Sequence, residues 1–454
     1  MPPVLCAALL LLWPAVWNGY PLVFSDTGTY LTQAIERHLG WDRPPFYSLA
    51  ILPLHMTLSL WPVVVAQALI AAWMLGLLRR ALLPAASAWS VVPLAGLLAL
   101  ATSLPWCAAQ VMPDLFTGLL VLAAALLLLT PEALPPRTRW AVAGAAAFMT
   151  ASHQSNLPIL LAVLLALAPL RRVLGATRPL GRRGLAALAL PPLLACAALV
   201  AVNAAGHGRA SLSPYGNVFV LARVIEDGPG RAALNRFCPE AGWKLCEWRD
   251  AMPDSADDFL WRADSPLNRA GGARAVSAEA NAIIAAAIRI APLATAGSAL
   301  RNFARQMTDF ATGDGLTAWP ATVSPAILRD FPGGEAASYA GARQTHDTLT
   351  VPEPLGALHI AAELAGVAGC IFALGFGWRR HVGAGFAAAA LLAVLANAAV
   401  TGCLSGPHDR YQARIMWLPL AVAVPALPAM LSRRTPSAAA VAAARRPAAL
   451  RFAG

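Results

Sequence analysis

Residues 61–80 read WPVVVAQALIAAWMLGLLRR, an uncharged apolar run that ends in the pair Arg79-Arg80. About 20 such residues cross the hydrocarbon core of a bilayer as a helix, and an arginine pair at one end marks the cytoplasmic side. Comparable apolar runs lie at 3–19, 55–78, 86–106, 113–130, 140–154, 156–170, 185–203, 356–378, 383–403 and 412–431. The pattern predicts an all-α polytopic membrane protein with about ten transmembrane helices, of which those at 140–154 and 156–170 are short.

The composition and the charge distribution agree with that fold class. Of 454 residues, 58% are hydrophobic and 13% are charged, about half the charge of an average soluble domain. The segments between alternate runs hold 16 basic residues and one acid, Glu132, whereas the rest of the chain holds 18 basic and 22 acidic residues. The net charge of +11 is therefore the positive-inside bias of a membrane protein, and we expect no nucleic-acid partner.

This bias predicts a cytoplasmic N-terminus and a division of the chain into four parts. They are an N-terminal transmembrane module (1–203), an extracytoplasmic loop domain (204–354), C-terminal transmembrane helices (355–432) and a basic cytoplasmic tail (433–454). The first external loop, 18–55, is expected to carry a short helix, and the large loop is expected to be mainly helical. Because all but one of the basic residues are arginine, we expect a bacterial protein of the inner (plasma) membrane with the large loop in the periplasm.

Two cysteines share the large loop. In an oxidising compartment Cys238 and Cys246 can form a disulfide, and the alternative is two free thiols. Neither the cysteine spacing nor histidine partners indicate a zinc site.

Polar side chains gather near the predicted outer ends of the helices. Glu363, with His359 four residues before it, is the one acid well inside an apolar run. The other candidates lie at the outer ends: Asp26, Asp42, Arg43, Asp114, His153, His408, Asp409, Arg410 and Arg414. A transporter would carry ionisable residues through the depth of the membrane, so this placement favours a site at the outer leaflet.

Each candidate also has a structural explanation. Asp26, near the start of a helix running to about His38, suits a catalytic acid or base, and equally a helix cap. Arg43 can bind a phosphate or pair with Asp42, and Arg410 and Arg414, four residues apart on one helical face, can bind phosphate or lipid headgroups.

The two remaining candidates have structural explanations of the same kind. An acid at Asp114 stabilises a helix dipole, and His153 can bond the backbone at the tip of a hairpin.

Four short motifs follow one another along the chain: Asp26 with Tyr30 in the first external loop, Arg43-Pro44-Pro45-Phe46-Tyr47, Pro113-Asp114, and Arg410-Tyr411. In this order they resemble motifs of the GT-C class of membrane glycosyltransferases, which includes protein mannosyltransferases and aminoarabinose transferases. The resemblance implies a polyprenyl-phosphate-linked sugar as donor. Family members often carry a second acid beside the first, where this chain has Ser25 and Thr27, so no metal is assigned and a divalent cation stays open as a cofactor.

The resulting hypothesis is a glycosyltransferase that acts on a lipid, glycan or protein acceptor and inverts the anomeric centre. Asp26 would be the general base, and Arg43, Arg410 and Arg414 would bind the donor phosphate. Tyr30, Asp42, Tyr47, Asp114, His153, His408, Asp409 and Tyr411 are further site candidates. Two alternatives remain: a transporter or flippase for a lipid-linked glycan, and a non-catalytic scaffold of envelope assembly.

Overall fold

The computed structural model describes residues 1–176, 179–377 and 381–432. In these ranges every regular element is a helix, and the one bridge between extended residues joins Leu22 to Gln110. The all-α class is confirmed for this part of the chain. The predicted basic tail, 433–454, lies outside the described residues.

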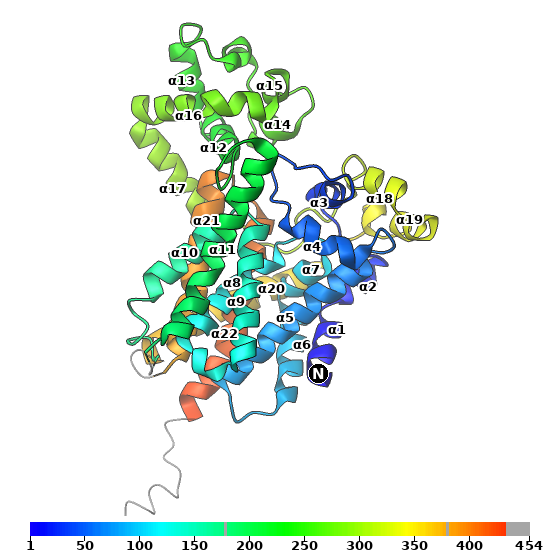
Figure 1. Ribbon diagram of the computed structural model, residues 1–454, viewed down its shortest axis with the longest axis vertical. Coiled ribbons are helices and arrows are strands. Elements are labelled where there is room, and N and C mark those ends of the chain that lie inside the picture. Colours follow the sequence, from blue (N-terminus) through cyan, green and yellow to red (C-terminus); the bar gives the residue numbers. More distant parts are fainter. Residues whose placement is uncertain (177–178, 378–380, 433–454) are drawn as a thin grey trace, which may run out of the picture.

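A bundle of helices forms the body of the molecule (Figure 1). Its members are α1 (Pro2–Leu10), α2 (Trp13–Asn18), α5 (Trp61–Leu82), α6 (Val91–Ala101), α7 (Leu104–Ala109), α8 (Leu115–Leu129), α9 (Pro136–Ser152), α10 (Asn156–Leu167), α11 (Arg182–His207), α20 (Glu353–Gly377), α21 (Gly383–Leu404) and α22 (Asp409–Ser432). Every residue of α8 is buried within the bundle, an environment that suits a helix that is apolar on all sides.

Five helices in the described residues are long and apolar enough to cross a membrane: α5, α11, α20, α21 and α22. A sixth span is counted if the bent pair α16–α17 crosses as one unit. These helices are consistent with a multi-pass membrane protein. The other predicted runs also form helices, but α8 and α10 are short and the runs at 3–19 and 86–106 are each broken in two, so helix length does not confirm ten spans.

One of these breaks explains the acid inside an apolar run. Between α6 and α7 the backbone at Thr102 is extended, which frees the N–H of Ser103. That N–H donates to Oε1 of Glu363 on α20 at 3.0 Å, and Nδ1 of His359 lies 2.9 Å from the Thr312 hydroxyl instead of pairing with the glutamate. Glu363 thus satisfies a backbone donor within the bundle.

Helices outside the bundle gather at one end, which we call the outer end (Figure 1). The first loop carries α3 (Ser25–Ile35) and α4 (Phe46–His55). The large loop carries α12 (Gly216–Glu226), α13 (Pro229–Phe237), α14 (Ala256–Trp261), α15 (Pro266–Arg269), α16 (Gly272–Ile290), α17 (Pro292–Thr308), α18 (Ser324–Asp330) and α19 (Gly333–Ala340). Short 3-10 turns lie at Ala88–Ser90, Pro131–Ala133, Lys244–Ala251 and Gln344–His346.

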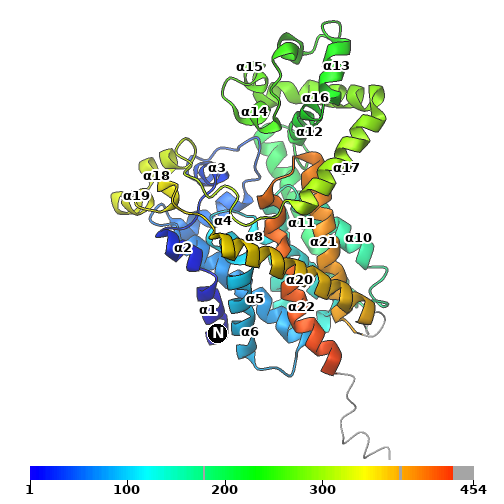
Figure 2. The same ribbon diagram turned by 180° about the vertical axis from the view of Figure 1, so that it is seen from behind.

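The large loop consists of two differently packed parts. Residues 216–290, here called the cap lobe, enclose a hydrophobic core of their own, and Cys238 and Cys246 form a disulfide in it, as the sequence predicts. Residues 309–352, here called the covering segment, pack instead on the first loop and share the core of the bundle. Figure 2 shows α18 and α19 of the covering segment beside α3.

Hydrogen bonds hold the covering segment in place. Oε1 of Glu335 accepts from the Tyr20 hydroxyl and from the Leu60 N–H, both at 2.8 Å. Oε1 of Gln344 accepts from the Val23 N–H at 3.0 Å. These bonds connect residues more than 250 positions apart, so local sequence patterns could not predict them.

Candidate functional site

Asp26 lies in the first turn of α3 and is available for an interaction other than capping. The N-terminus of α3 is bonded through Thr27, whose hydroxyl accepts from the Phe24 N–H at 2.9 Å. Oδ2 of Asp26 accepts from Nη2 of Arg43 at 2.8 Å and from Nε at 3.1 Å. Oδ1 of Asp26 has no hydrogen-bond or ion-pair partner among the described residues, since its contacts are made through Oδ2.

Arg43 is held from several sides at the turn before α4. Besides Asp26 it binds the Asp42 carbonyl through Nη1 at 3.1 Å, whereas the Asp42 carboxylate lies 3.9 Å away. Burial raises the pKa of the Asp42 carboxyl; Arg43 opposes that rise and Asp26 adds to it. The predicted alternative for Arg43, an ion pair with Asp42, is therefore the weaker of its two contacts, and Asp26 is its main partner.

A second ion cluster joins α8 to α22. Oδ2 of Asp114 lies 3.4 Å from Nη1 of Arg410, and Oδ1 lies 3.2 Å from Nη1 of Arg414. Arg410 also approaches Oδ2 of Asp26, at 3.8 Å. Arg410 therefore links the two acids that come from the first loop and from α8.

The two arginines of α22 have different surroundings. Arg414 is 0% exposed, and its Nη2 donates to Oγ of Ser155 and Oδ1 of Asn397, both at 2.9 Å. Arg410 lies beside two cavities, with its guanidinium 3.9 Å from the ring centre of Phe24. Of the three predicted phosphate ligands, Arg43 and Arg410 can reach a ligand, and Arg414 lies behind them, where it holds Asp114.

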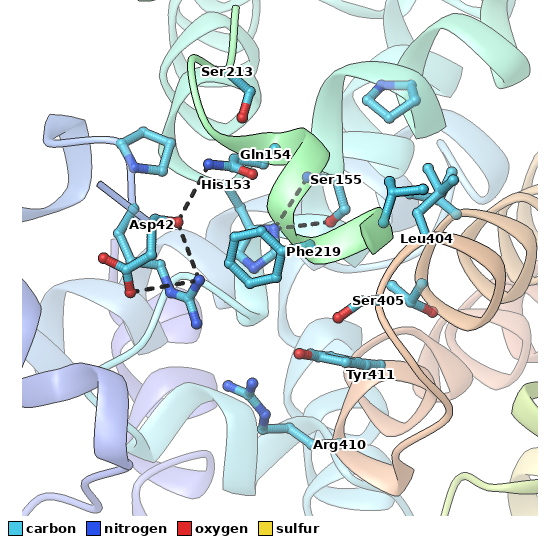
Figure 3. A pocket seen from close by; sticks show the side chains of 17 residues that line it. Asp42, His153, Gln154, Ser155, Ser213, Phe219, Leu404, Ser405, Arg410 and Tyr411 are labelled. Atoms are coloured by element: carbon cyan, nitrogen blue, oxygen red, sulfur yellow. Dashed lines mark hydrogen bonds and ion pairs between the residues drawn. The ribbon is translucent and has the colours of Figure 1, made fainter. Parts of the chain in front are cut away.

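Two cavities meet at Arg43 and Arg410. The inner cavity, of about 240 Å³, lies between the bundle and α12 and is mostly apolar (Figure 3). Its lining includes Asp42, Arg43, His153, Gln154, Ser155, Pro158, Phe219, Val220, Val400, Leu404, Arg410 and Tyr411. The outer cavity, of about 490 Å³, opens toward the cap lobe and contains Asp26 in its wall.

The remaining predicted residues divide between the cavities and the packing around them. His153 and Tyr411 line the inner cavity (Figure 3). Nδ1 of His153 accepts from the Ser155 backbone N–H at 3.2 Å and lies 2.8 Å from the Ser155 hydroxyl, at the break between α9 and α10. His408 lines the outer cavity. Asp409 lies in neither lining and accepts from the Ala311 N–H at 2.6 Å, which attaches the covering segment to α22.

Two of the three predicted tyrosines pack against each other and line neither the inner nor the outer cavity. Tyr30 and Tyr47 are buried and in contact, with ring centres 4.9 Å apart. The Tyr47 hydroxyl donates to Oε1 of Gln67 at 2.7 Å. Neither ring lines the inner or the outer cavity, so these tyrosines support α3 and α4.

Several residues at the site were not predicted from the sequence. Phe24 and Trp319 pack together beside Arg410, and Asp257 and Trp261 come from α14 of the cap lobe. One available signal was the concentration of tryptophans in the large loop, which is uncommon for a simple connector. The position of Trp261 at the cavity that contains Asp26 depends on long-range packing.

A metal site was left open by the sequence. Among residues 1–176, 179–377 and 381–432 no group of three or more histidine, cysteine, aspartate or glutamate side chains is arranged to hold a metal ion. Two acids at the site are paired with arginine, Asp26 with Arg43 and Asp114 with Arg414.

Similarity searches add no further constraint on the function. No protein-family model matches the chain, and no curated protein or solved structure is significantly similar to it. The resemblance to GT-C glycosyltransferases stays a prediction made from short motifs. The functional proposal therefore rests on the geometry of Asp26, Arg43 and Arg410.

Proposed function

We propose that this protein is an inverting membrane glycosyltransferase that moves a sugar from a polyprenyl-phosphate donor to an acceptor. One observation carries the proposal: Asp26 from the first loop and two arginines, Arg43 and Arg410, converge where an apolar cavity meets a more polar one. A transfer reaction needs these three groups together, a base next to the acceptor and fixed cations next to the leaving group.

The inner cavity suits the lipid end of the donor. Its wall is formed largely by apolar side chains such as Val220, Val400 and Leu404, which suits a polyprenyl chain. Arg43 and Arg410 lie at its junction with the outer cavity, where the phosphate would sit. Guanidinium groups bind phosphate oxygens through paired hydrogen bonds.

The reaction then uses the free oxygen of Asp26. Oδ1 accepts the proton of an acceptor hydroxyl while the acceptor oxygen attacks C1 of the donor sugar. The bond between C1 and the phosphate oxygen breaks, and its electron pair stays on the phosphate, whose charge Arg43 and Arg410 stabilise. Attack from the face opposite the leaving group inverts C1.

The arrangement of arginines supports a periplasmic site. Arg79 and Arg80 end α5, and Arg182 and Arg183 begin α11, at the end of the bundle opposite the cap lobe (Figure 1). By the positive-inside rule that end is cytoplasmic. The site and the cap lobe, at the other end, then lie on the extracytoplasmic face of a bacterial inner membrane.

The test is sugar transfer in membranes that contain wild type or Asp26→Asn, with a panel of radiolabelled polyprenyl-phosphate sugars. Wild type should label an acceptor with one sugar, and Asp26→Asn, present in equal amount, should not. The matched control is Asp254→Asn, since Asp254 is fully exposed on the cap lobe and should not alter transfer.

Other results would favour the alternatives. Equal transfer by wild type and Asp26→Asn refutes the role of the base. Movement of an unreacted lipid-linked glycan across wild-type vesicles, without transfer, would favour a flippase. Adding EDTA to the same assay tests for a divalent cation, and its inhibition would assign a metal.

A further inference from the structure

The outer cavity has a wall that the transfer chemistry does not require. Trp261 and Asp257, both on α14 of the cap lobe, line it together with Trp319 and Asp314 of the covering segment. Ser25, Thr29 and Thr322 add hydroxyl groups to the lining. The cavity thus combines two indole rings with several acceptors of hydrogen bonds.

The charge of this wall differs from that of the inner cavity. Four carboxylates, those of Asp26, Asp42, Asp257 and Asp314, line it against the two guanidiniums of Arg43 and Arg410. This leaves an excess of two negative charges, whereas the inner cavity has one carboxylate against the same two guanidiniums. An anionic ligand is therefore repelled from the outer cavity and attracted to the inner one.

Trp261 is placed to receive a ligand. Trp41 and Phe219 contact its ring, with centres 5.6 and 6.0 Å away, and Arg43 lies 5.8 Å from its centre. Despite these neighbours, Trp261 is 45% exposed. A large aromatic surface that is fixed by packing and still open to a cavity with several polar groups is typical of a binding surface.

We propose that the outer cavity binds an uncharged saccharide as the acceptor, with a sugar ring stacked on Trp261 and hydroxyl groups donating to Asp257. The apolar C–H face of a pyranose fits an indole ring, and its hydroxyls supply the donors that carboxylates accept. The acceptor role rests on the proposed glycosyltransferase function. The saccharide site itself depends only on the cavity.

The experiment measures binding without donor, so that it does not depend on catalysis. Purified protein in nanodiscs is titrated with maltotriose and, separately, with trigalacturonic acid, and dissociation constants are obtained by ligand-observed NMR. Wild type should bind maltotriose saturably and bind the triacid at least about tenfold more weakly, since the cavity has excess negative charge.

Variants locate the saccharide. Trp261→Ala should weaken maltotriose binding about tenfold, because the stacking surface is lost. Asp257→Ala provides a second variant that should fold normally, since its side chain is half-exposed and its described ion-pair partner is His408 at 3.5 Å. Trp89→Ala, an exposed tryptophan at the opposite end of the bundle, is the control and should bind normally.

Three results would overturn the inference. They are no saturable binding of maltotriose, equal affinity for the triacid, and unchanged affinity in both Trp261→Ala and Asp257→Ala. A protein that binds maltotriose at Trp261 but transfers no sugar would retain the saccharide site and lose the glycosyltransferase proposal, so the two failures are distinguishable.

Discussion

Replacing Asp114 with leucine should destabilise the protein more than any change at an exposed acid. Asp114 is 2% exposed and accepts from the fully buried Arg414. In Asp114→Leu, Arg414 keeps only the neutral acceptors of Ser155 and Asn397, and its Nε already lacks a hydrogen-bond partner. Leaving one charge of a buried pair uncompensated costs about 3–5 kcal/mol.

This free-energy cost corresponds to a decrease in the melting temperature, Tm. With an unfolding entropy of about 2.1 cal/mol/K per residue, a chain of this length has an unfolding entropy of about 1 kcal/mol/K. The Tm of Asp114→Leu should therefore fall by about 3–5 °C. The assay is thermal unfolding of the purified protein in nanodiscs, followed by intrinsic tryptophan fluorescence, with Asp254→Leu on the exposed surface as a control that should melt like wild type.

A double variant distinguishes the cost of leaving one buried charge unpaired from the cost of replacing a side chain. Asp114→Leu combined with Arg414→Leu removes both charges, so it should melt above Asp114→Leu, because replacing a whole buried ion pair with apolar side chains is nearly neutral. The reasoning is refuted if Asp114→Leu melts within about 1 °C of wild type, or if the two single losses add in the double variant.

Three further predictions concern the first loop and the cap lobe. Gly28→Ala should abolish transfer and lower the Tm, because the new Cβ would overlap the Thr322 carbonyl and push α3 away from the covering segment; wild-type activity would refute this. Burial raises the pKa of the Asp42 carboxyl, so the protonated carboxyl stabilises the fold fully below about pH 3.9, and this stabilisation is lost as the pH rises through the raised pKa. The Tm measured against pH should therefore vary less in Asp42→Asn than in wild type. Cys238→Ser opens the disulfide to Cys246 and should make the cap lobe sensitive to limited proteolysis, and an unchanged digestion pattern would contradict a stabilising role.

Local patterns in the sequence were sufficient to predict the helical membrane bundle. Uncharged runs and flanking arginines depend only on neighbouring residues, and each run forms a helix or a pair of helices. The disulfide between Cys238 and Cys246 was predicted for the same reason, since the two residues are close in sequence. Helix breaks were less predictable, because the break at Ser103 is stabilised by Glu363 on a distant helix.

The candidate site was predicted in its members but not in its roles. Asp26, Arg43 and Arg410 were identified from residue type and predicted membrane side. Nothing in their spacing indicated that Asp26 pairs with Arg43, or that Arg414 is enclosed behind Asp114. A charge lowers its free energy by pairing with whichever opposite charge the fold brings near, so its partner depends on the packing of helices and not on local sequence.

The large loop shows the same difference between what local sequence predicts and what long-range packing decides. Its length, prolines and tryptophans were enough to predict a folded segment of helices. Only the tertiary structure shows that 216–290 forms its own core while 309–352 covers the first loop, and that Trp261 reaches the cavity of Asp26. Helix formation depends on hydrogen bonds and apolar periodicity within a few turns, whereas these placements depend on surfaces that meet across hundreds of residues.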